Sequence, residues 1–262
     1  MRLFPLLISA LFCAAPLLAH AEGSASRSDA GSPQFSDQTA AAGITYRNVF
    51  GGDEKQFIIE SHGSGAAFFD ADSDGDLDLY IANGSTFATY LDRSGPGNAL
   101  YQNQGDGTFA DITQPAGVGD AGWAGGIAVG DIDNDGHPDL YATNYGANIL
   151  YQNQGVAEMG AARSDAAPGT FTDITQPAGV GGDHYSASAA FFDYDRDGDL
   201  DLYVANYVVF DAANRPAQPA LCTFFGGLRV YCGPKGLVGA PDALYRNEGH
   251  GHFTAVTRAA GI

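Results

Sequence analysis

The stretch DADSDGDLD at residues 70–78 decides the fold, because it recurs along the chain. Its copies are DIDNDGHPD at 131–139 and DYDRDGDLD at 193–201, so the three starts lie 61 and then 62 residues apart. A second motif recurs in phase with the first, with FADITQPAGV at 109–118, FTDITQPAGV at 171–180, and outer copies FSDQTAAAGI at 35–44 and FTAVTRAAGI at 253–262. Two interleaved motifs in phase indicate a tandem-repeat architecture.

Within one repeat unit the pattern predicts four short strands. Residues 65–69 are rich in small residues, 77–82 alternate apolar and other residues, and 98–103 and 108–112 follow on either side of a Gly-Asp-Gly turn. Four antiparallel strands per unit of about sixty residues are typical of a propeller blade. The fold class is therefore all-β, a β-propeller of four-stranded blades. The small residues of the first strand suit a crowded propeller axis.

Three full units lie between Phe35 and Ile262, whereas closed propellers usually have four to eight blades. We expect the chain to be a segment of a larger propeller, and a self-associating half-propeller is the alternative. Insertions are predicted in loops: residues 156–168 interrupt the last turn of the second unit, and residues 208–241 form a longer excursion in the third.

Each acidic stretch has the composition of a calcium loop. Positions are counted from the first Asp of each stretch, so that Asp70, Asp131 and Asp193 are position 1. Asp at positions 1, 3 and 5 with Gly at position 6 lets alternate carboxylates converge on one hard cation, and the backbone carbonyl of position 7 can join them. Oxygen-only ligation favours Ca²⁺ over zinc or copper. An EF-hand is excluded because Ile81, Ala142 and Val204 occupy position 12, where a bidentate Glu is needed. Solvated acidic turns are the alternative. The candidate ligands, with position 9 included, are Asp70, Asp72, Asp74, Asp76, Asp78; Asp131, Asp133, Asp135, His137, Asp139; and Asp193, Asp195, Asp197, Asp199, Asp201.

These loops, followed by Leu-Asp-Leu-Tyr and by Asn-x-Gly-Asp-Gly-Thr-Phe, resemble the FG-GAP/VCBS repeats of integrin-α-like propellers. The resemblance covers about residues 35–262. It is strongest to the group of secreted cartilage acidic proteins and bacterial ASPIC/UnbV-type proteins, through GSGAAFFD at 63–70, ANY at 205–207, Cys222 and YCGPKG at 231–236. It implies a calcium-stabilised propeller used in adhesion or interaction. Members of that group continue through further blades and usually a C-terminal domain, whose functions do not transfer.

The first residues predict a signal peptide at 1–21. Arg2 precedes an apolar run at 3–18, and Ala19-His20-Ala21 gives a cleavage site after Ala21. A lipoprotein anchor at Cys13 is the rival interpretation. Residues 22–34 are predicted to be a disordered leader, and residues 35–262 the propeller segment. The mature chain is expected to be secreted, periplasmic or on the cell surface, without a membrane span.

Export changes the interpretation of the remaining cysteines. Cys222 and Cys232 are expected to form a disulfide in an oxidising compartment, and a pair of buried thiols is the alternative. The formal net charge of −19 argues against a nucleic-acid partner and against anionic membranes. The partner expected is an extracellular protein or glycan.

No set of converging catalytic groups is evident, so the chain is not expected to be an enzyme. His62, Trp123 and Tyr185 each stand eight residues before an acidic loop and are candidates to stack on a ligand such as a sugar. Packing between blades is the alternative for these three rings. Two functions remain: an interaction or adhesion module in which calcium is structural, or an accessory propeller of a secreted carbohydrate-active enzyme.

Overall fold

The computed structural model describes residues 34–61, 63–155, 169–215, 221–234 and 236–262. The predicted signal peptide, the leader up to residue 33 and the insertion at 156–168 lie outside the described residues. The chain divides into two units, one ending at Asp37 and one spanning Gln38–Ile262. All the helices and strands named below belong to the second unit.

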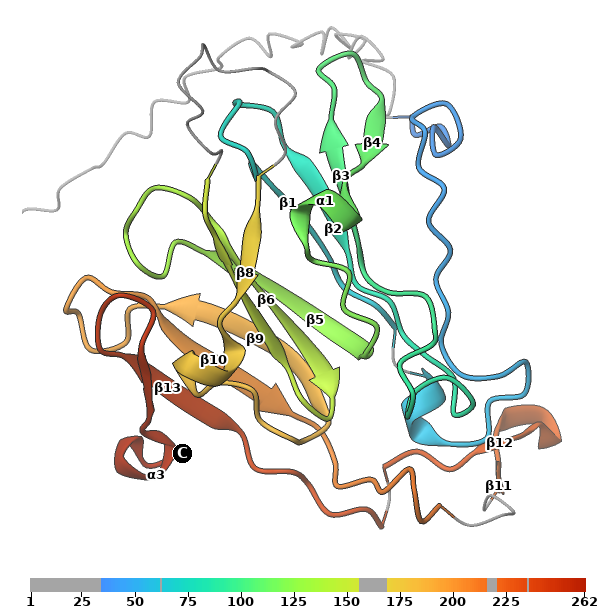
Figure 1. The fold of residues 1–262 in the computed structure, drawn as a ribbon. Coiled ribbons are helices and arrows are strands. Elements are labelled where there is room, and N and C mark those ends of the chain that lie inside the picture. Colours follow the sequence, from blue (N-terminus) through green and yellow to red (C-terminus); the bar gives the residue numbers. More distant parts are fainter. Residues whose placement is uncertain (1–33, 62, 156–168, 216–220, 235) are drawn as a thin grey trace, which may run out of the picture. The chain divides into compact units, whose positions relative to one another are not determined.

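Three four-stranded antiparallel sheets form the second unit (Figure 1). Blade 1 contains β1 (Ala66–Phe69), β2 (Asp78–Ile81), β3 (Ala99–Asn103) and β4 (Phe109–Asp111) in this order. Blade 2 contains β5 (Trp123–Gly130), β6 (Asp139–Tyr145), β7 (Ile149–Asn153) and β8 (Phe171–Asp173). Blade 3 contains β9 (Ser186–Phe192), β10 (Asp201–Asn206), β13 (Ala243–Asn247) and β14 (Phe253–Ala255). The all-β class and the four-stranded blades predicted from the sequence are confirmed.

The first strands of the blades approach one another closely, as their small residues predict. Gly65 donates its backbone N–H to the carbonyl of Gly125 at 2.6 Å, and a Cβ on Gly65 would lie 2.9 Å from that oxygen. A Cβ on Gly126 would lie 2.8 Å from the Cα of Ser188 in β9. Neither distance leaves room for a side chain, so glycine is required at both positions.

Two apolar clusters fill the spaces between blades. One joins side chains of blade 1 to blade 2, among them Phe69, Tyr80, Leu100, Leu140, Tyr151 and Phe171. The other joins blade 2 to blade 3, among them Ile132, Tyr141, Leu150, Leu202 and Val204. Because full burial of one such side chain stabilises by about 1.5–3 kcal/mol, these clusters are the main attraction between blades.

A single helical turn follows the outer strand of each blade: α1 (Thr113–Ala116), α2 (Thr175–Ala178) and α3 (Thr257–Ala260). In blade 1, Asp111 Oδ1 accepts the backbone N–H of Thr113 at 3.0 Å, and Thr113 Oγ1 accepts the N–H of Leu100 at 2.9 Å. Blade 2 repeats both bonds. These bonds explain the Asp-x-Thr spacing of the second repeated motif. The turns are too short for helical periodicity to predict them.

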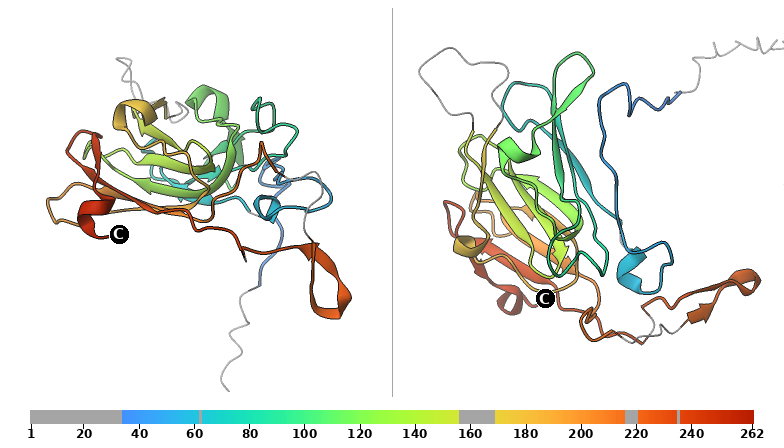
Figure 2. Two further views of the ribbon diagram at one scale, coloured as in Figure 1. Left: turned by 90° about the horizontal axis from the view of Figure 1, so that it is seen from below. Right: turned by 45° about the vertical axis from the view of Figure 1, so that its right-hand side comes forward.

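The excursion in blade 3 carries a two-stranded hairpin of β11 (Leu221–Thr223) and β12 (Arg229–Tyr231), joined by η2 (Phe225–Gly227). Cys222 and Cys232 form the predicted disulfide. Figure 2 shows this hairpin standing apart from the blades. A further single turn, η1 (Ile58–Ser61), precedes β1. Among the described residues, no helix is both long and apolar enough to cross a membrane.

Candidate metal centres in the acidic loops

The first aspartate of each acidic loop folds the loop around its own carboxylate. Asp70 accepts the backbone N–H groups of Asp74 and Gly75, each at 3.0 Å. Asp131 and Asp193 accept the equivalent pairs in their loops, at 2.9–3.2 Å. The side chain thereby fixes the backbone at positions 5 and 6 of the loop against position 1.

The backbone enters the left-handed region twice in each loop. Position 4 has φ of 60° at Ser73, 60° at Asn134 and 68° at Arg196. At position 6 the values are 98°, 89° and 99°, and glycine occupies all three loops. A φ near 90° is costly for any residue with a Cβ, which explains the invariant Gly of the repeat.

The folded loops bring carboxylates together. One oxygen from each of Asp70, Asp72 and Asp78 lies within 4.8 Å of the others, and Asp131, Asp133 and Asp139 repeat this group. In the third loop the group consists of Asp193, Asp195 and Asp197, all exposed. Positions 1 and 3 are thus shared by all three groups. The other candidate ligands lie outside these groups: Asp74, Asp76, Asp135, His137, Asp199 and Asp201.

Position 7 has a side-chain role that the sequence did not reveal. The His137 Nδ1 atom lies 3.0 Å from the hydroxyl of Ser73, and Asn134 Nδ2 donates to Asp199 Oδ1 at 2.8 Å. Each contact joins position 4 of one loop to position 7 of the loop in the next blade. The acidic loops of neighbouring blades are therefore in direct contact.

Position 9 is buried in every blade and ties the loop to the third strand. Asp78 accepts the backbone N–H of Ala71 at 2.9 Å and that of Asn103 at 2.8 Å. Asp139 and Asp201 accept the two equivalent N–H groups in their blades. Burial, together with the other carboxylates of the loop, raises the pKa of Asp78 to about 6 and that of Asp139 to about 7. A bound cation would favour the ionised form of these groups.

The donor set fits calcium. All ligand atoms are carboxylate oxygens, and Asp133 Oδ1 is buried without a hydrogen-bond partner among the described residues. An orphaned buried oxygen is costly unless something such as a cation binds it. The second oxygen of Asp133 accepts from the side-chain amide of Gln152, and Gln102 donates to Asp72 in the same way. These two glutamines hold position 3 in place.

The third loop differs because Arg246 replaces the glutamine. Arg246 pairs with Glu248 at 2.6 Å instead of bonding the position-3 carboxylate. Its positive charge near Asp195 opposes a cation there. The third group is therefore expected to be the weakest cation site of the three.

The rings proposed for ligand stacking are not available to a ligand in this structure. Trp123 is 0% exposed and Tyr185 is 2% exposed. The centroid of the Trp123 ring lies 5.4 Å from that of Phe87, and the centroid of the Tyr185 ring lies 5.7 Å from that of Tyr145. The structure thus favours interblade packing for both rings, since a buried ring offers no face to a sugar. His62 lies outside the described residues.

A set of asparagines was missed by the sequence reasoning. Asn103, Asn153 and Asn247 end the third strand of each blade, and the last two are buried. Asn153 donates from Nδ2 to the carbonyl of Ala71 at 2.9 Å, and Asn247 donates to that of Ile132 at 2.8 Å. Both acceptors stand at position 2 of the acidic loop of the preceding blade. The recurrence of Leu-Tyr-x-Asn in phase with the acidic loops was the signal available.

Comparison with known proteins agrees with this geometry. The family profile of the FG-GAP-like repeat matches residues 70–142 and 131–204, together more than half of the chain. The chain belongs to the FG-GAP-like repeat family. Each match runs from one acidic loop to the middle strands of the next blade, so the profile follows the repeat found in the sequence.

Three relatives share the name cartilage acidic protein 1. That of Xenopus tropicalis is 38% identical over 66 residues, which are 25% of this chain and 10% of the relative. Those of Mus musculus and Homo sapiens are each 29% identical over 150 residues, which are 55% of this chain and 21% of the relative. The chain spans about a fifth or less of the length of these curated relatives.

Proposed function

We propose that this chain is an extracellular FG-GAP-repeat module that binds a protein or glycan partner and is stabilised by structural calcium. The observation that carries the calcium assignment is the group of Asp131, Asp133 and Asp139, in which a buried carboxylate oxygen has no partner among the described atoms. The disulfide between Cys222 and Cys232 supports an oxidising compartment. Secretion by way of the signal peptide at 1–21 remains part of this proposal.

Calcium would act on blade packing as well as on the loops. Without a cation, the carboxylates of one loop repel each other, and the loop contacts the next blade through position 4. Neutralising the loop charge would therefore stabilise the blade and its contact with the neighbouring blade. The ion needs no catalytic role, and we propose that the module is not an enzyme.

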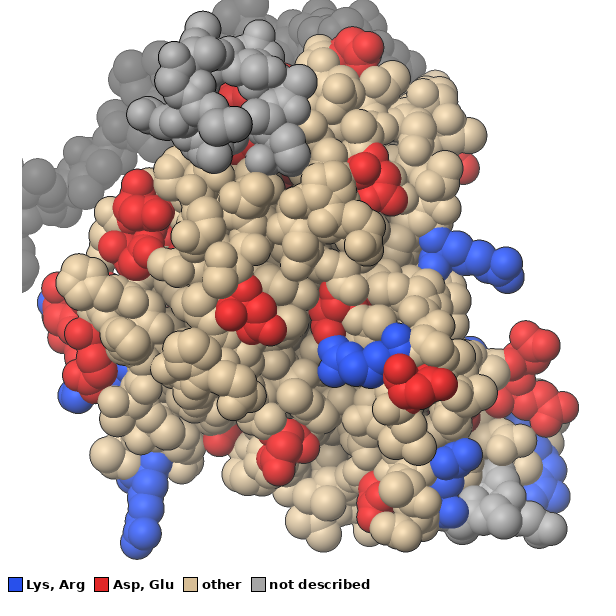
Figure 3. All heavy atoms as spheres, viewed as in Figure 1, with Lys and Arg blue, Asp and Glu red and all other residues tan. Residues whose placement is uncertain are grey.

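An interaction role is supported by the surface and by the relatives. Carboxylates are spread over the face drawn in Figure 3, and Lys and Arg are fewer there. None of the three relatives named above carries an enzyme's name, which favours an interaction module over an accessory propeller of a carbohydrate-active enzyme. Such a surface would steer basic partners toward the protein at low ionic strength.

The test is calcium binding by calorimetry, together with thermal unfolding of residues 22–262 in calcium, magnesium or chelator. Extracellular calcium modules have Kd values of about 10⁻⁴–10⁻³ M. At ten times the Kd each site stabilises by about 1.4 kcal/mol, or roughly 3–6 °C for a domain of this size. We expect calcium, and not magnesium, to give this shift.

A matched pair of variants makes the test specific. Asp133→Asn removes a ligand of the second group. This variant should bind one calcium ion fewer and should lose the part of the Tm shift that this ion gives. Asp53→Asn removes the same charge from an exposed position outside the loops, and it should keep both the number of bound calcium ions and the full Tm shift. A folded protein that is indifferent to calcium would contradict the metal assignment and leave the loops as solvated acidic turns.

A further inference from the structure

The excursion of blade 3, residues 208–241, exposes an unusual number of apolar side chains. Single exposed apolar side chains are common on soluble proteins, but a gathering of them marks an interaction site. In the part of the chain that the structure describes, this excursion exposes as many large apolar side chains as all other segments together: Val209, Leu221, Phe224, Phe225, Leu228, Leu237 and Val238.

The two ends of the excursion are fixed to the blades and to each other. Val209 donates its backbone N–H to the carbonyl of Val238 at 2.8 Å, so the first and last segments of the excursion pair. Tyr145 of β6 holds the first segment, because its hydroxyl donates to the carbonyl of Phe210 at 2.8 Å and accepts the N–H of Ala212 at 2.9 Å. The excursion therefore leaves the blades from a defined base.

The hairpin of β11 and β12 ends in an ordered apolar tip, residues 224–228, which stands apart from the blades (Figure 2). The N–H of Phe224 donates to the carbonyl of Leu228 at 2.7 Å, and that of Gly227 donates to the carbonyl of Phe224 at 3.1 Å. Phe224, Phe225 and Leu228 are nevertheless 68%, 92% and 61% exposed. Since these bonds and the disulfide already hold the tip, it has little conformational freedom to lose on binding.

The charge of the excursion is opposite to that of the chain as a whole. Residues 212–241 contain Arg215, Arg229 and Lys235 and none of the 31 Asp and Glu residues. Arg229 follows the tip directly in the sequence and is exposed, whereas Arg215 lies over the ring of Phe87. The net charge of −19 argues against an anionic membrane for the whole chain, but it does not describe this segment.

We propose that the tip of this hairpin inserts into the surface of a phospholipid bilayer. Phe224, Phe225 and Leu228 would lie between the headgroups and the upper acyl chains, and the guanidinium of Arg229 would pair with a phosphate. Binding of this kind increases with the apolar area that is buried and with attraction between basic side chains and anionic lipids. The tip would hold the module at a membrane without a membrane span, and this role does not depend on calcium.

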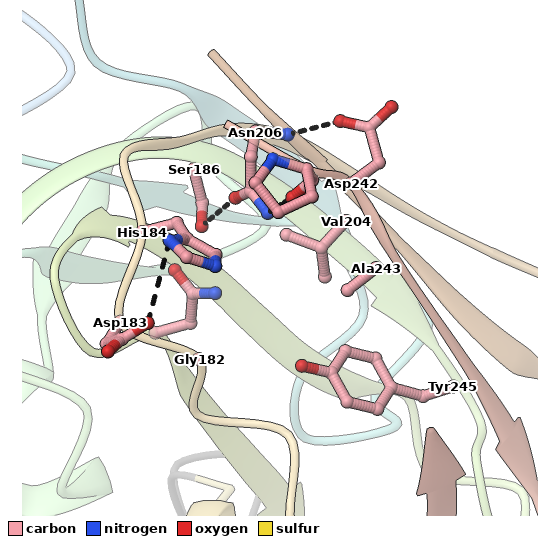
Figure 4. A pocket seen from close by; sticks show the side chains of 11 residues that line it. Gly182, Asp183, His184, Ser186, Val204, Asn206, Asp242, Ala243 and Tyr245 are labelled. Carbon is pink, nitrogen blue, oxygen red and sulfur yellow. Dashed lines mark hydrogen bonds and ion pairs between the residues drawn. The ribbon is translucent and has the colours of Figure 1, made fainter. Parts of the chain in front are cut away.

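The shape of the tip favours lipid over a protein. A convex apolar tip needs a matching apolar groove in a protein partner, whereas a fluid bilayer closes around it. A second copy of the chain offers no such groove at the cavity drawn in Figure 4, because Asp183, His184 and Asp242 line that cavity. The basic side chain beside the tip also complements lipid phosphates.

The test is co-sedimentation of calcium-loaded residues 22–262 with sucrose-loaded vesicles of phosphatidylcholine and phosphatidylglycerol at about 4:1. The salt concentration is about 0.15 M, where the Debye length of about 8 Å limits repulsion between the lipid and the acidic blades. We expect a bound fraction that saturates with lipid. Burial of one phenylalanine ring strengthens such partitioning by about thirtyfold, and one basic side chain near an anionic surface strengthens it by about fivefold.

Two pairs of variants make the test specific to the tip. Phe224→Ser combined with Phe225→Ser should weaken binding at least thirtyfold, whereas Phe35→Ser removes an exposed ring outside the excursion and should leave binding unchanged. Arg229→Gln should weaken binding about fivefold, and Arg258→Gln, at another exposed arginine, should not. All these side chains are exposed, so the variants are expected to fold, and their thermal unfolding verifies this.

The position of the tip has its own readout. In Phe225→Trp the new indole should shift its emission to shorter wavelength on vesicles and should be quenched by brominated lipid, over the constant emission of the buried Trp123. Failure of the wild-type chain to bind vesicles would overturn the proposal. Equal binding by the double serine variant would also overturn it, because calcium would then bridge the acidic loops to lipid phosphates. Self-association through the tip in analytical ultracentrifugation, without vesicle binding, would assign the tip to a second copy instead.

Discussion

Replacing Asn153 by alanine should separate the packing between blades from the stability of a single blade. Its amide is 1% exposed and donates both to Ala71 O in blade 1, at 2.9 Å, and to Pro138 O in its own blade, at 3.2 Å. Asn103 occupies the same position in blade 1. Among the described residues its amide bonds only within its own blade, to Leu77 O at 3.1 Å, at an exposed site. The two substitutions therefore differ mainly by one buried bond across the blades.

The magnitude follows from that bond. A hydrogen bond contributes about 0.5–1.5 kcal/mol net, and leaving a buried carbonyl without a partner costs about 1–3 kcal/mol. Asn103→Ala loses bonds that water can replace. Asn153→Ala should therefore lower the free energy of unfolding by about 2 kcal/mol more than Asn103→Ala, or roughly 4–8 °C in Tm for a domain of this size.

The assay is urea unfolding of both variants at one saturating calcium concentration, with m-values compared to verify that the same surface unfolds. Asn247→Ala is an internal repeat of the experiment, because Asn247 donates across to Ile132 O at 2.8 Å. We expect it to match Asn153→Ala. Equal losses in all three variants would refute the reasoning, since the bond across blades would then contribute nothing measurable.

Three further predictions concern the loops and the hairpin. Asp139→Asn should cost about 2–3 kcal/mol even in chelator, measured by urea unfolding, because an amide cannot accept both backbone N–H groups that the carboxylate accepts. Gly75→Ala should cost about 1–2 kcal/mol from its φ of 98°, whereas Gly63→Ala, with no atom within 4 Å of its Cβ and no positive φ, should be near neutral in the same assay. Replacing Cys222 and Cys232 by serine should speed amide hydrogen exchange in the hairpin while leaving the main thermal transition in place, because within the part of the chain that the structure describes β11 and β12 pair only with each other.

The blades were predictable from the sequence because three levels of pattern agree. The alternation around Leu79 and Tyr80, the turn residues and the repeat spacing all place the same strands, and the structure has them within one or two residues. The disulfide was predictable for a different reason, since the predicted cleavage after Ala21 would leave Cys222 and Cys232 as the two cysteines available to pair. Each of these inferences rests on local chemistry.

The features that the sequence did not reveal depend on contacts between blades. The side-chain contacts of His137 and Asp199 at position 7, and the bond from Asn153 to Ala71, join residues of different blades. The ring of Trp123 shows the same limit. Its position before a loop suggested a ligand platform, but the neighbours that bury it, such as Phe87, come from a loop whose path the repeat does not specify.

These cross-blade contacts change what calcium would do. The carbonyl of Ala71 accepts from Asn153, and the N–H of the same residue donates to Asp78, a member of the first carboxylate group. One peptide segment thus connects the proposed ion site of blade 1 to the third strand of blade 2, and Ile132 repeats the connection to blade 3 through Asp139 and Asn247. An ion that orders a loop would also hold these groups in place for the neighbouring blade. The stabilisation by calcium should therefore fall in Asn153→Ala and persist in Asn103→Ala, because only the first variant removes the contact through which a loop acts on the next blade.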